Sequence, residues 1–303
     1  MLLVEVTDCD SFPPMSEDHA ACISRPKDLP MSIRPNRVKQ KLKAGETVWS
    51  SSLRLPEPGL CEVLGYAGWD FVLLDGEHGA LDATTLDRLV QGCFAGGTVP
   101  IVRVLRPNDP EAIMHALDLG AQGILIPHCR TVEDERRLVS AAMYPPRGNR
   151  GFGPGRGTRW GRVSGAEYLA TANDEVVLLA LIEGPEGVEN VEAIAAGGLD
   201  GLWVGVGDLA LGYGVGTDRD HPLVTQAAER ILAACQKHGI ACAYPARTAE
   251  EGRRAAAQGY RLIVFGGAEQ YVMSESRRFL NEVAATTSSD DSQSNQVQSR
   301  VQN

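Results

Sequence analysis

Carboxylates and a histidine follow short apolar runs at three separated points of the chain. Asp75, Glu77 and His78 follow Phe-Val-Leu-Leu, Glu183 ends Val-Val-Leu-Leu-Ala-Leu-Ile, and Asp208 ends Gly-Leu-Trp-Val-Gly-Val-Gly. A carboxylate that ends so apolar a run lies in surroundings of low dielectric and needs a compensating charge. Two such carboxylates on neighbouring strand ends repel each other, and a hard divalent cation with oxygen ligands relieves the repulsion. Glu183 and Asp208 are therefore the candidate metal ligands.

Both residues also have ordinary structural interpretations. Glu183 could cap a helix that begins near Pro185 or pair with an arginine, and Asp208 could simply shape a turn. Gly205 and Gly207 precede Asp208, and their backbone N–H groups could hold a substrate carboxylate, although a turn is the default interpretation of a Gly-x-Gly pair.

A cation and a base complete the chemistry that these carboxylates suggest. Arg103 interrupts a buried apolar strand, and its planar guanidinium could stabilise an enolate, with a structural ion pair as the rival interpretation. His78 shares a short turn with two carboxylates, and a nearby carboxylate could orient its imidazole and tune its basicity. Asp118, at the end of an apolar helical pattern, is a candidate for that partner. His128, which follows another predicted strand, receives no role.

The lysines argue against imine chemistry. A Schiff base needs a desolvated lysine within reach of the substrate carbonyl, and none of the five lysines follows the carboxyl end of a predicted strand. The chain also lacks G-x-x-x-x-G-K-[ST] and G-x-G-x-x-G, so a nucleotide cradle has no support. Any carbanion would have to be stabilised by the metal and Arg103.

Eight strand-and-helix units must position these residues. Strands are predicted at 47–53, 71–75, 99–104, 123–127, 176–183, 201–206, 240–243 and 261–265, and helices at 56–66, 83–94, 110–119, 132–142, 187–196, 223–237, 249–257 and 268–283. Right-handed crossovers between parallel strands then give a (β/α)₈ TIM barrel. Catalytic residues of this fold lie at the carboxyl ends of the strands, where the candidate residues fall.

The barrel is expected to form a single domain over residues 35–285. Residues 1–34 are rich in proline and residues 286–303 in polar side chains, so both are predicted to be disordered extensions. No apolar run is long enough to cross a membrane, the first ten residues are acidic, and the seven cysteines show no C-x-x-C. These features predict a cytoplasmic protein without a membrane partner.

One loop is strongly basic in a chain whose net charge is −10. Residues 145–162 combine glycines and two aromatic residues with five arginines: Arg147, Arg150, Arg156, Arg159 and Arg162. Such a composition can bind RNA, but the charge of the whole chain argues against a nucleic-acid partner. The loop could instead hold an anionic substrate or pack against a neighbouring subunit.

Several segments together resemble the class II, metal-dependent pyruvate aldolases of the 4-hydroxy-2-oxoheptanedioate and 2-keto-3-deoxy sugar acid type. The sequence is also similar to macrophomate synthase, a family member that acts on oxaloacetate. The resemblance spans about residues 35–285 and is carried by segments 69–79, 102–103, 117–121, 144–151, 181–183 and 200–209.

The resemblance implies a set of roles. Glu183 and Asp208 would bind Mg²⁺, Mn²⁺ or Co²⁺, and His78 would be the acid and base. Asp118 would raise the basicity of His78, and Arg103 would bind substrate and stabilise the pyruvate enolate.

The resemblance also implies contacts outside these roles, and one departure from the family. Gly207 matches a position whose backbone contacts the substrate beside Asp208. Many of these aldolases have glutamine at the substrate-contacting position of Leu181, so substrate choice is the property that this leucine would change. Family members usually form hexamers, as trimers of dimers, by exchanging the last helix, here about residues 268–283.

We therefore expect a carbon–carbon lyase that cleaves 4-hydroxy-2-oxo acids to pyruvate and an aldehyde. The first rival is an oxaloacetate decarboxylase similar to macrophomate synthase, which would use the same enolate. A rival of another class is a non-catalytic barrel that binds or assembles with other molecules through the arginine-rich loop.

Overall fold

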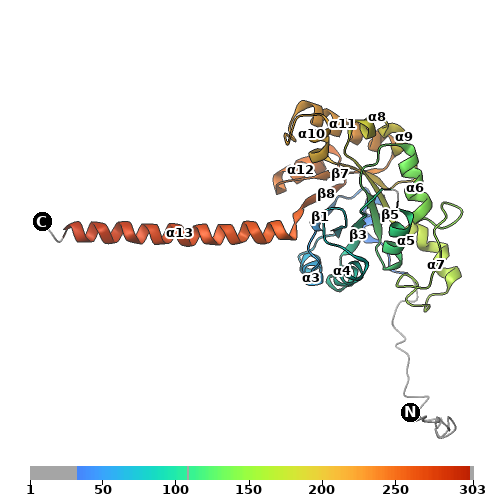
Figure 1. Ribbon diagram of the computed structural model, residues 1–303, viewed down its shortest axis with the longest axis horizontal. Coiled ribbons are helices and arrows are strands. Elements are labelled where there is room, and N and C mark those ends of the chain that lie inside the picture. Colours follow the sequence, from blue (N-terminus) through green and yellow to red (C-terminus); the bar gives the residue numbers. More distant parts are fainter. Residues whose placement is uncertain (1–32, 108, 301–303) are drawn as a thin grey trace, which may run out of the picture. The chain divides into compact units, whose positions relative to one another are not determined.

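The predicted (β/α)₈ barrel is confirmed by a computed structural model, which describes residues 33–107 and 109–300, with side chains as far as residue 284. Eight parallel strands close the barrel in sequence order, and helices surround it (Figure 1). The strands are β1 (Val48–Leu53), β2 (Phe71–Asp75), β3 (Val99–Arg103), β4 (Gly123–Ile126), β5 (Val177–Ile182), β6 (Gly201–Val204), β7 (Ala241–Pro245) and β8 (Leu262–Gly267).

Each predicted helix is present, and the fifth is divided in two. The helices are α2 (Arg37–Lys43), α3 (Pro58–Tyr66), α4 (Ala83–Gly96), α5 (Pro110–Asp118), α6 (Val132–Ala142), α7 (Gly165–Thr171), the 3₁₀ turn η1 (Ala172–Glu175), α8 (Pro185–Glu189), α9 (Val191–Ala195), α10 (Val206–Gly212), α11 (Pro222–His238), α12 (Ala249–Gln258) and α13 (Ala268–Arg300). Of these, α2, α7 and α10 were not predicted, because they are only one or two turns long and show little apolar periodicity.

The two ends of the chain relate differently to the predicted boundaries. Most of the expected N-terminal extension, residues 1–32, lies outside the described residues. At the other end, α13 continues to Arg300, whereas we expected an irregular chain from residue 286 onward.

The barrel interior is filled by large apolar side chains. Phe71, Ile101 and Leu179 lie in this inner cluster, and Val38 of α2 joins it. Full burial of a side chain of this size stabilises the fold by about 1.5–3 kcal/mol. The interior is therefore a packed core, and any site must lie at one of its two ends.

The arginine-rich loop lies at the amino end of the barrel. Arg156 Nε donates to the carbonyl oxygen of Leu119, just before β4, at 2.9 Å, and Arg150 Nη2 lies 2.7 Å from Asp118 Oδ1. Because all strands run in the same direction, this end is opposite the carboxyl ends of the strands. None of the described helices is long and apolar enough to span a membrane.

Candidate active site

A cavity of about 450 Å³ lies at the carboxyl ends of the strands. Leu181 and Trp203 contribute to its apolar lining, while Arg103, Glu183 and Asp208 contribute polar groups. A TIM barrel places its chemistry at this end, so the cavity is the candidate active site.

Asp75 anchors Arg103 at the edge of this cavity. The two residues are register partners on β2 and β3, and Asp75 accepts from Arg103 Nε at 2.9 Å and from Arg103 Nη2 at 2.6 Å. Burial opposes ionisation of Asp75, but the hydrogen bonds and charge of Arg103 lower the pKa of the Asp75 carboxyl below its ordinary value. Arg54 adds a third contact, with its Nε 3.2 Å from Asp75 Oδ2. The carboxylate therefore fixes the plane of the Arg103 guanidinium.

A chain of close contacts runs from Arg103 to Glu183. Arg103 Nη1 lies 2.8 Å from Glu77 Oε2, and His128 Nε2 lies 3.0 Å from Glu77 Oε1. The other ring nitrogen of His128 lies 2.8 Å from Glu183 Oε1, which also accepts from the His128 backbone N–H at 2.6 Å. His128 adopts a φ of 50°, which is unusual for a residue with a side chain. These contacts hold the histidine in that conformation.

Glu183 is a buried carboxylate beside other carboxylates. Burial, followed by Asp208 and Glu77, raises the pKa of Glu183 to about 8, against the opposing effect of the His128 N–H. Asp208 lies in the first turn of α10, which begins directly after β6 and Gly205. Ligand atoms of Glu77, His128 and Glu183 lie within 4.8 Å of one another. The donor set and its unfavourable charge therefore fit a divalent cation.

Comparison with known proteins identifies the family. Residues 51–273 match the HpcH/HpaI aldolase/citrate lyase family. The chain belongs to this family. It is 36% identical over 237 residues to 5-keto-4-deoxy-D-glucarate aldolase of Salmonella paratyphi C, which covers 78% of this chain and 91% of the relative. The predicted class of enzyme, a carbon–carbon lyase, is confirmed by this match.

Solved structures agree with the sequence comparison. An HpcH/HpaI family protein from Burkholderia cenocepacia J2315 superposes with a TM-score of 0.78 at 32% identity, covering 82% of this chain and 99% of that protein. Macrophomate synthase superposes with a TM-score of 0.73 at 26% identity, covering 90% and 98%. The resemblance to this family, macrophomate synthase included, that the sequence indicated is therefore confirmed.

The structure does not bring all the predicted site residues together within one chain. His78 lies at the rim, 61% exposed, with its Nε2 3.8 Å from Glu77 Oε2. Asp118 is the last residue of α5, which runs back to the amino end of the barrel, and there it pairs with Arg150. A single chain therefore does not form the expected contact between Asp118 and His78.

The two remaining substrate-binding candidates lie at the cavity. Leu181 is buried in the barrel interior, next to Trp203 in strand register. Gly207 is in the first turn of α10 and has open space where a side chain would be.

Sequence reasoning missed the contacts of Glu77 and His128. Both residues follow predicted strands, so the sequence placed them at the correct end of the barrel. Their pairing depends on the φ of His128 and on the relative positions of β2, β4 and β5, which no local pattern reports.

Proposed function

We propose that this aldolase uses a divalent cation to cleave 4-hydroxy-2-oxo acids to pyruvate and an aldehyde, and catalyses the reverse reaction. The observation that carries the proposal is the position of the buried Glu183 carboxylate, which has ligand atoms of Glu77 and His128 within 4.8 Å, because a cation is what would make this cluster favourable. Similarity to 5-keto-4-deoxy-D-glucarate aldolase supports a 2-oxo acid substrate.

Glu183 and Asp208 would hold the cation, which would be Mg²⁺, Mn²⁺ or Co²⁺. When bound, it supplies a Lewis acid that polarises the 2-oxo group of the substrate. Ligand atoms of Glu77 and His128 lie within 4.8 Å of a Glu183 carboxylate oxygen, so these two residues would orient Glu183 or add ligands. None of the described residues that line this cavity is a lysine, and the proposed mechanism uses no imine.

Different residues of the chain would transfer the proton and stabilise the developing negative charge. His78 would take the proton from the 4-hydroxyl group through a water as the C3–C4 bond breaks, and would return a proton to C3 of the pyruvate enolate. Arg103, fixed by Asp75, would donate to the developing enolate oxygen. The backbone of Gly207 would contact the substrate carboxylate. Asp118 could serve His78 only if a second copy of the chain brings it there.

A second candidate reaction is decarboxylation of oxaloacetate. It would share the enolate and the same residues, and the structural similarity to macrophomate synthase favours it. The resemblance implies a substrate-contacting glutamine amide at the position of Leu181. Its absence here would remove one hydrogen bond worth about 0.5–1.5 kcal/mol and so would affect selection among 2-oxo acids.

The test is release of pyruvate from 4-hydroxy-2-oxo acids and from oxaloacetate, before and after chelation and with metal added back. We expect chelation and Glu183→Gln to abolish turnover. Glu192→Gln, a carboxylate on the surface that pairs with Lys237, is the matched control and should leave turnover unchanged. Activity that survives both chelation and Glu183→Gln would contradict the proposal.

We also propose a homo-oligomer formed through α13, with a hexamer as the expected state. Val272, Met273, Phe279 and Leu280 project from this helix, and the last two are 56% and 69% exposed. Apolar side chains exposed at this density on one helix indicate an interface. The cytoplasmic location stays a prediction.

A further inference from the structure

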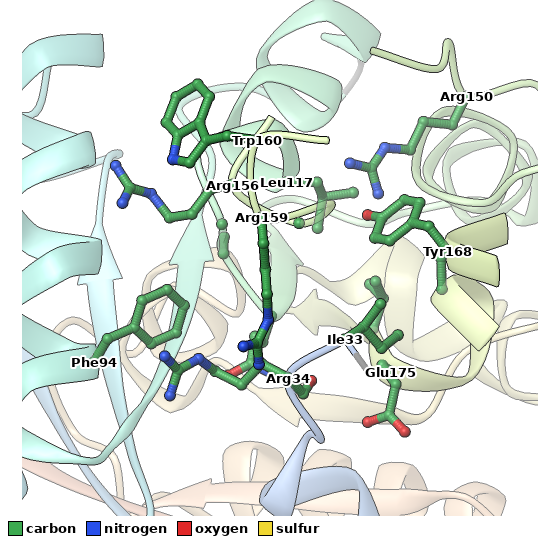
Figure 2. A pocket seen from close by; sticks show the side chains of 16 residues that line it. Ile33, Arg34, Phe94, Leu117, Arg150, Arg156, Arg159, Trp160, Tyr168 and Glu175 are labelled. Carbon is green, nitrogen blue, oxygen red and sulfur yellow. Dashed lines mark hydrogen bonds between the residues drawn. The ribbon is translucent and has the colours of Figure 1, made fainter. Parts of the chain in front are cut away.

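A second cavity, of about 280 Å³, lies at the amino end of the barrel. Gln122 and Val176, which line it, directly precede β4 and β5, so it is at the opposite end from the candidate active site. Figure 2 shows that the arginine-rich loop and the segment before α2 contribute its side chains. We call it the arginine cavity.

Four arginines line the arginine cavity, and they differ in their partners. Arg150 pairs with Asp118 and Arg156 pairs with Asp87. Arg34 and Arg159, in contrast, have no carboxylate at ion-pair distance among the side chains that the structure describes.

The positive charges of Arg34 and Arg159 lie near each other in the arginine cavity. Figure 2 shows the Arg159 side chain extending toward the Arg34 guanidinium. Burial, then the charges of Arg159 and Arg37, lower the pKa of Arg34 below its ordinary value. The Arg34 guanidinium lies 4.1 Å over the Phe94 ring, which fixes its plane. Glu175, the one carboxylate in the described lining of this cavity, accepts from the backbone N–H of Asn36. Two cations without a carboxylate at ion-pair distance among the described side chains, in a chain with a net charge of −10, favour binding of an anion between them.

The backbone conformation of the loop fixes the position of Arg159. Arg159 and Trp160 have consecutive positive φ values of 51° and 59°, a conformation that side chains rarely adopt. Buried Thr158 holds this turn, because its Oγ1 accepts from the N–H groups of Gly155 at 3.1 Å and of Gly161 at 3.3 Å. Strain of this kind persists where the surrounding structure fixes it, which is common at ligand sites.

A buried donor in the same cavity also lacks an acceptor. The Arg150 side chain is 2% exposed, and its Nε has no hydrogen-bond partner among the described residues. Buried donors are nearly always satisfied, so an unsatisfied one indicates a missing partner.

We propose that the arginine cavity binds a small dianion, either a phosphate group or a dicarboxylate, held between Arg34 and Arg159. A guanidinium matches both kinds of oxyanion with two parallel hydrogen bonds. A volume of about 280 Å³ is at the lower limit for small-molecule sites, which selects a small ligand. The arginine cavity lies at the end of the barrel opposite the active site of the same chain, and the proposal does not depend on the proposed reaction.

Calorimetric titration of the full-length protein with inorganic phosphate, succinate and acetate tests the proposal. We expect phosphate or succinate to bind, the better of the two identifying the source of the dianion, and acetate to bind at least tenfold more weakly. Arg34→Met and Arg159→Met should each weaken dianion binding by about tenfold or more. Arg159→Lys, which keeps the charge but not the fork, should give an intermediate loss.

Arg162→Met is the matched control, because Arg162 is in the same loop, exposed, and outside the cavity lining. It should bind dianions as the unaltered protein does. Equal affinity in Arg159→Met, Arg34→Met and the unaltered protein would overturn the proposal. The proposal would also be overturned if no dianion bound and Arg159→Met changed the oligomeric mass. A second copy of the chain would then be the partner of these arginines.

Discussion

Asp75→Asn tests whether the Asp75 carboxylate is what orients the guanidinium of Arg103. Asparagine has the same shape and keeps one oxygen, which can still accept from the backbone N–H groups of Glu77 and His78, now at 3.2 Å each. It replaces the other oxygen by a donor. That donor would face Arg103 Nη2 and Arg54 Nε, which lie 2.6 Å and 3.2 Å from the present oxygen.

The expected loss of unfolding free energy follows from the burial of Asp75 and from the ion pairs that remain after the substitution. Asp75 is 1% exposed, and removal of one partner from a buried ion pair costs about 3–5 kcal/mol. Arg103 keeps Glu77 at 2.8 Å and Arg54 keeps Glu269 at 2.7 Å, so we expect the lower value, about 3 kcal/mol of unfolding free energy. If Arg103 also stabilises an enolate, loss of its orientation should lower kcat by about 10²–10³.

Denaturant unfolding and the rate of pyruvate release measure the two effects separately. Asp70→Asn is the matched control, because Asp70 precedes the same strand and pairs with Lys41 at the other end of the barrel. It should cost about 1 kcal/mol or less and leave kcat unchanged. A loss of stability below about 1 kcal/mol in Asp75→Asn, or a kcat within threefold of the unaltered enzyme, would refute the reasoning.

Three further predictions concern other parts of the molecule. A Cβ at Gly205 would lie 2.3 Å from the Cβ of Glu183, so Gly205→Ala should displace that carboxylate and lower kcat by about tenfold or more, at a cost of about 1–3 kcal/mol in unfolding free energy. Gly207→Ala meets no atom within 4 Å and should change the unfolding free energy by no more than about 0.5 kcal/mol; equal unfolding costs at both positions would refute this. Burial opposes ionisation of Glu251, but hydrogen bonds from Arg247 lower the pKa of the Glu251 carboxyl below its ordinary value of 4.5. The stability that the ionised group contributes is therefore present above about pH 4.5 and is lost as the pH falls below it. Glu251→Gln should therefore flatten the fall in unfolding free energy between about pH 5 and about pH 3, and an unchanged slope would contradict the assignment. Phe279→Glu should lower the mass measured by light scattering, and an unchanged mass would exclude α13 as the interface.

The sequence by itself determined the barrel and the end of it where chemistry occurs. Apolar runs bounded by glycine and proline predict strands directly. An example is β2, which was predicted and is observed at 71–75. The prediction for β6 ran two residues too far, because Val206 already begins α10 after Gly205. Such patterns are local, so a single sequence contains them in full.

The tertiary structure alone decided which of these residues meet. Asp75 faces Arg103 because β2 and β3 pair in that register, and His128 joins Glu77 to Glu183 because its backbone turns into the left-handed region. Contacts of this kind depend on register, barrel closure and side-chain direction, which arise only when segments distant in the sequence pack together.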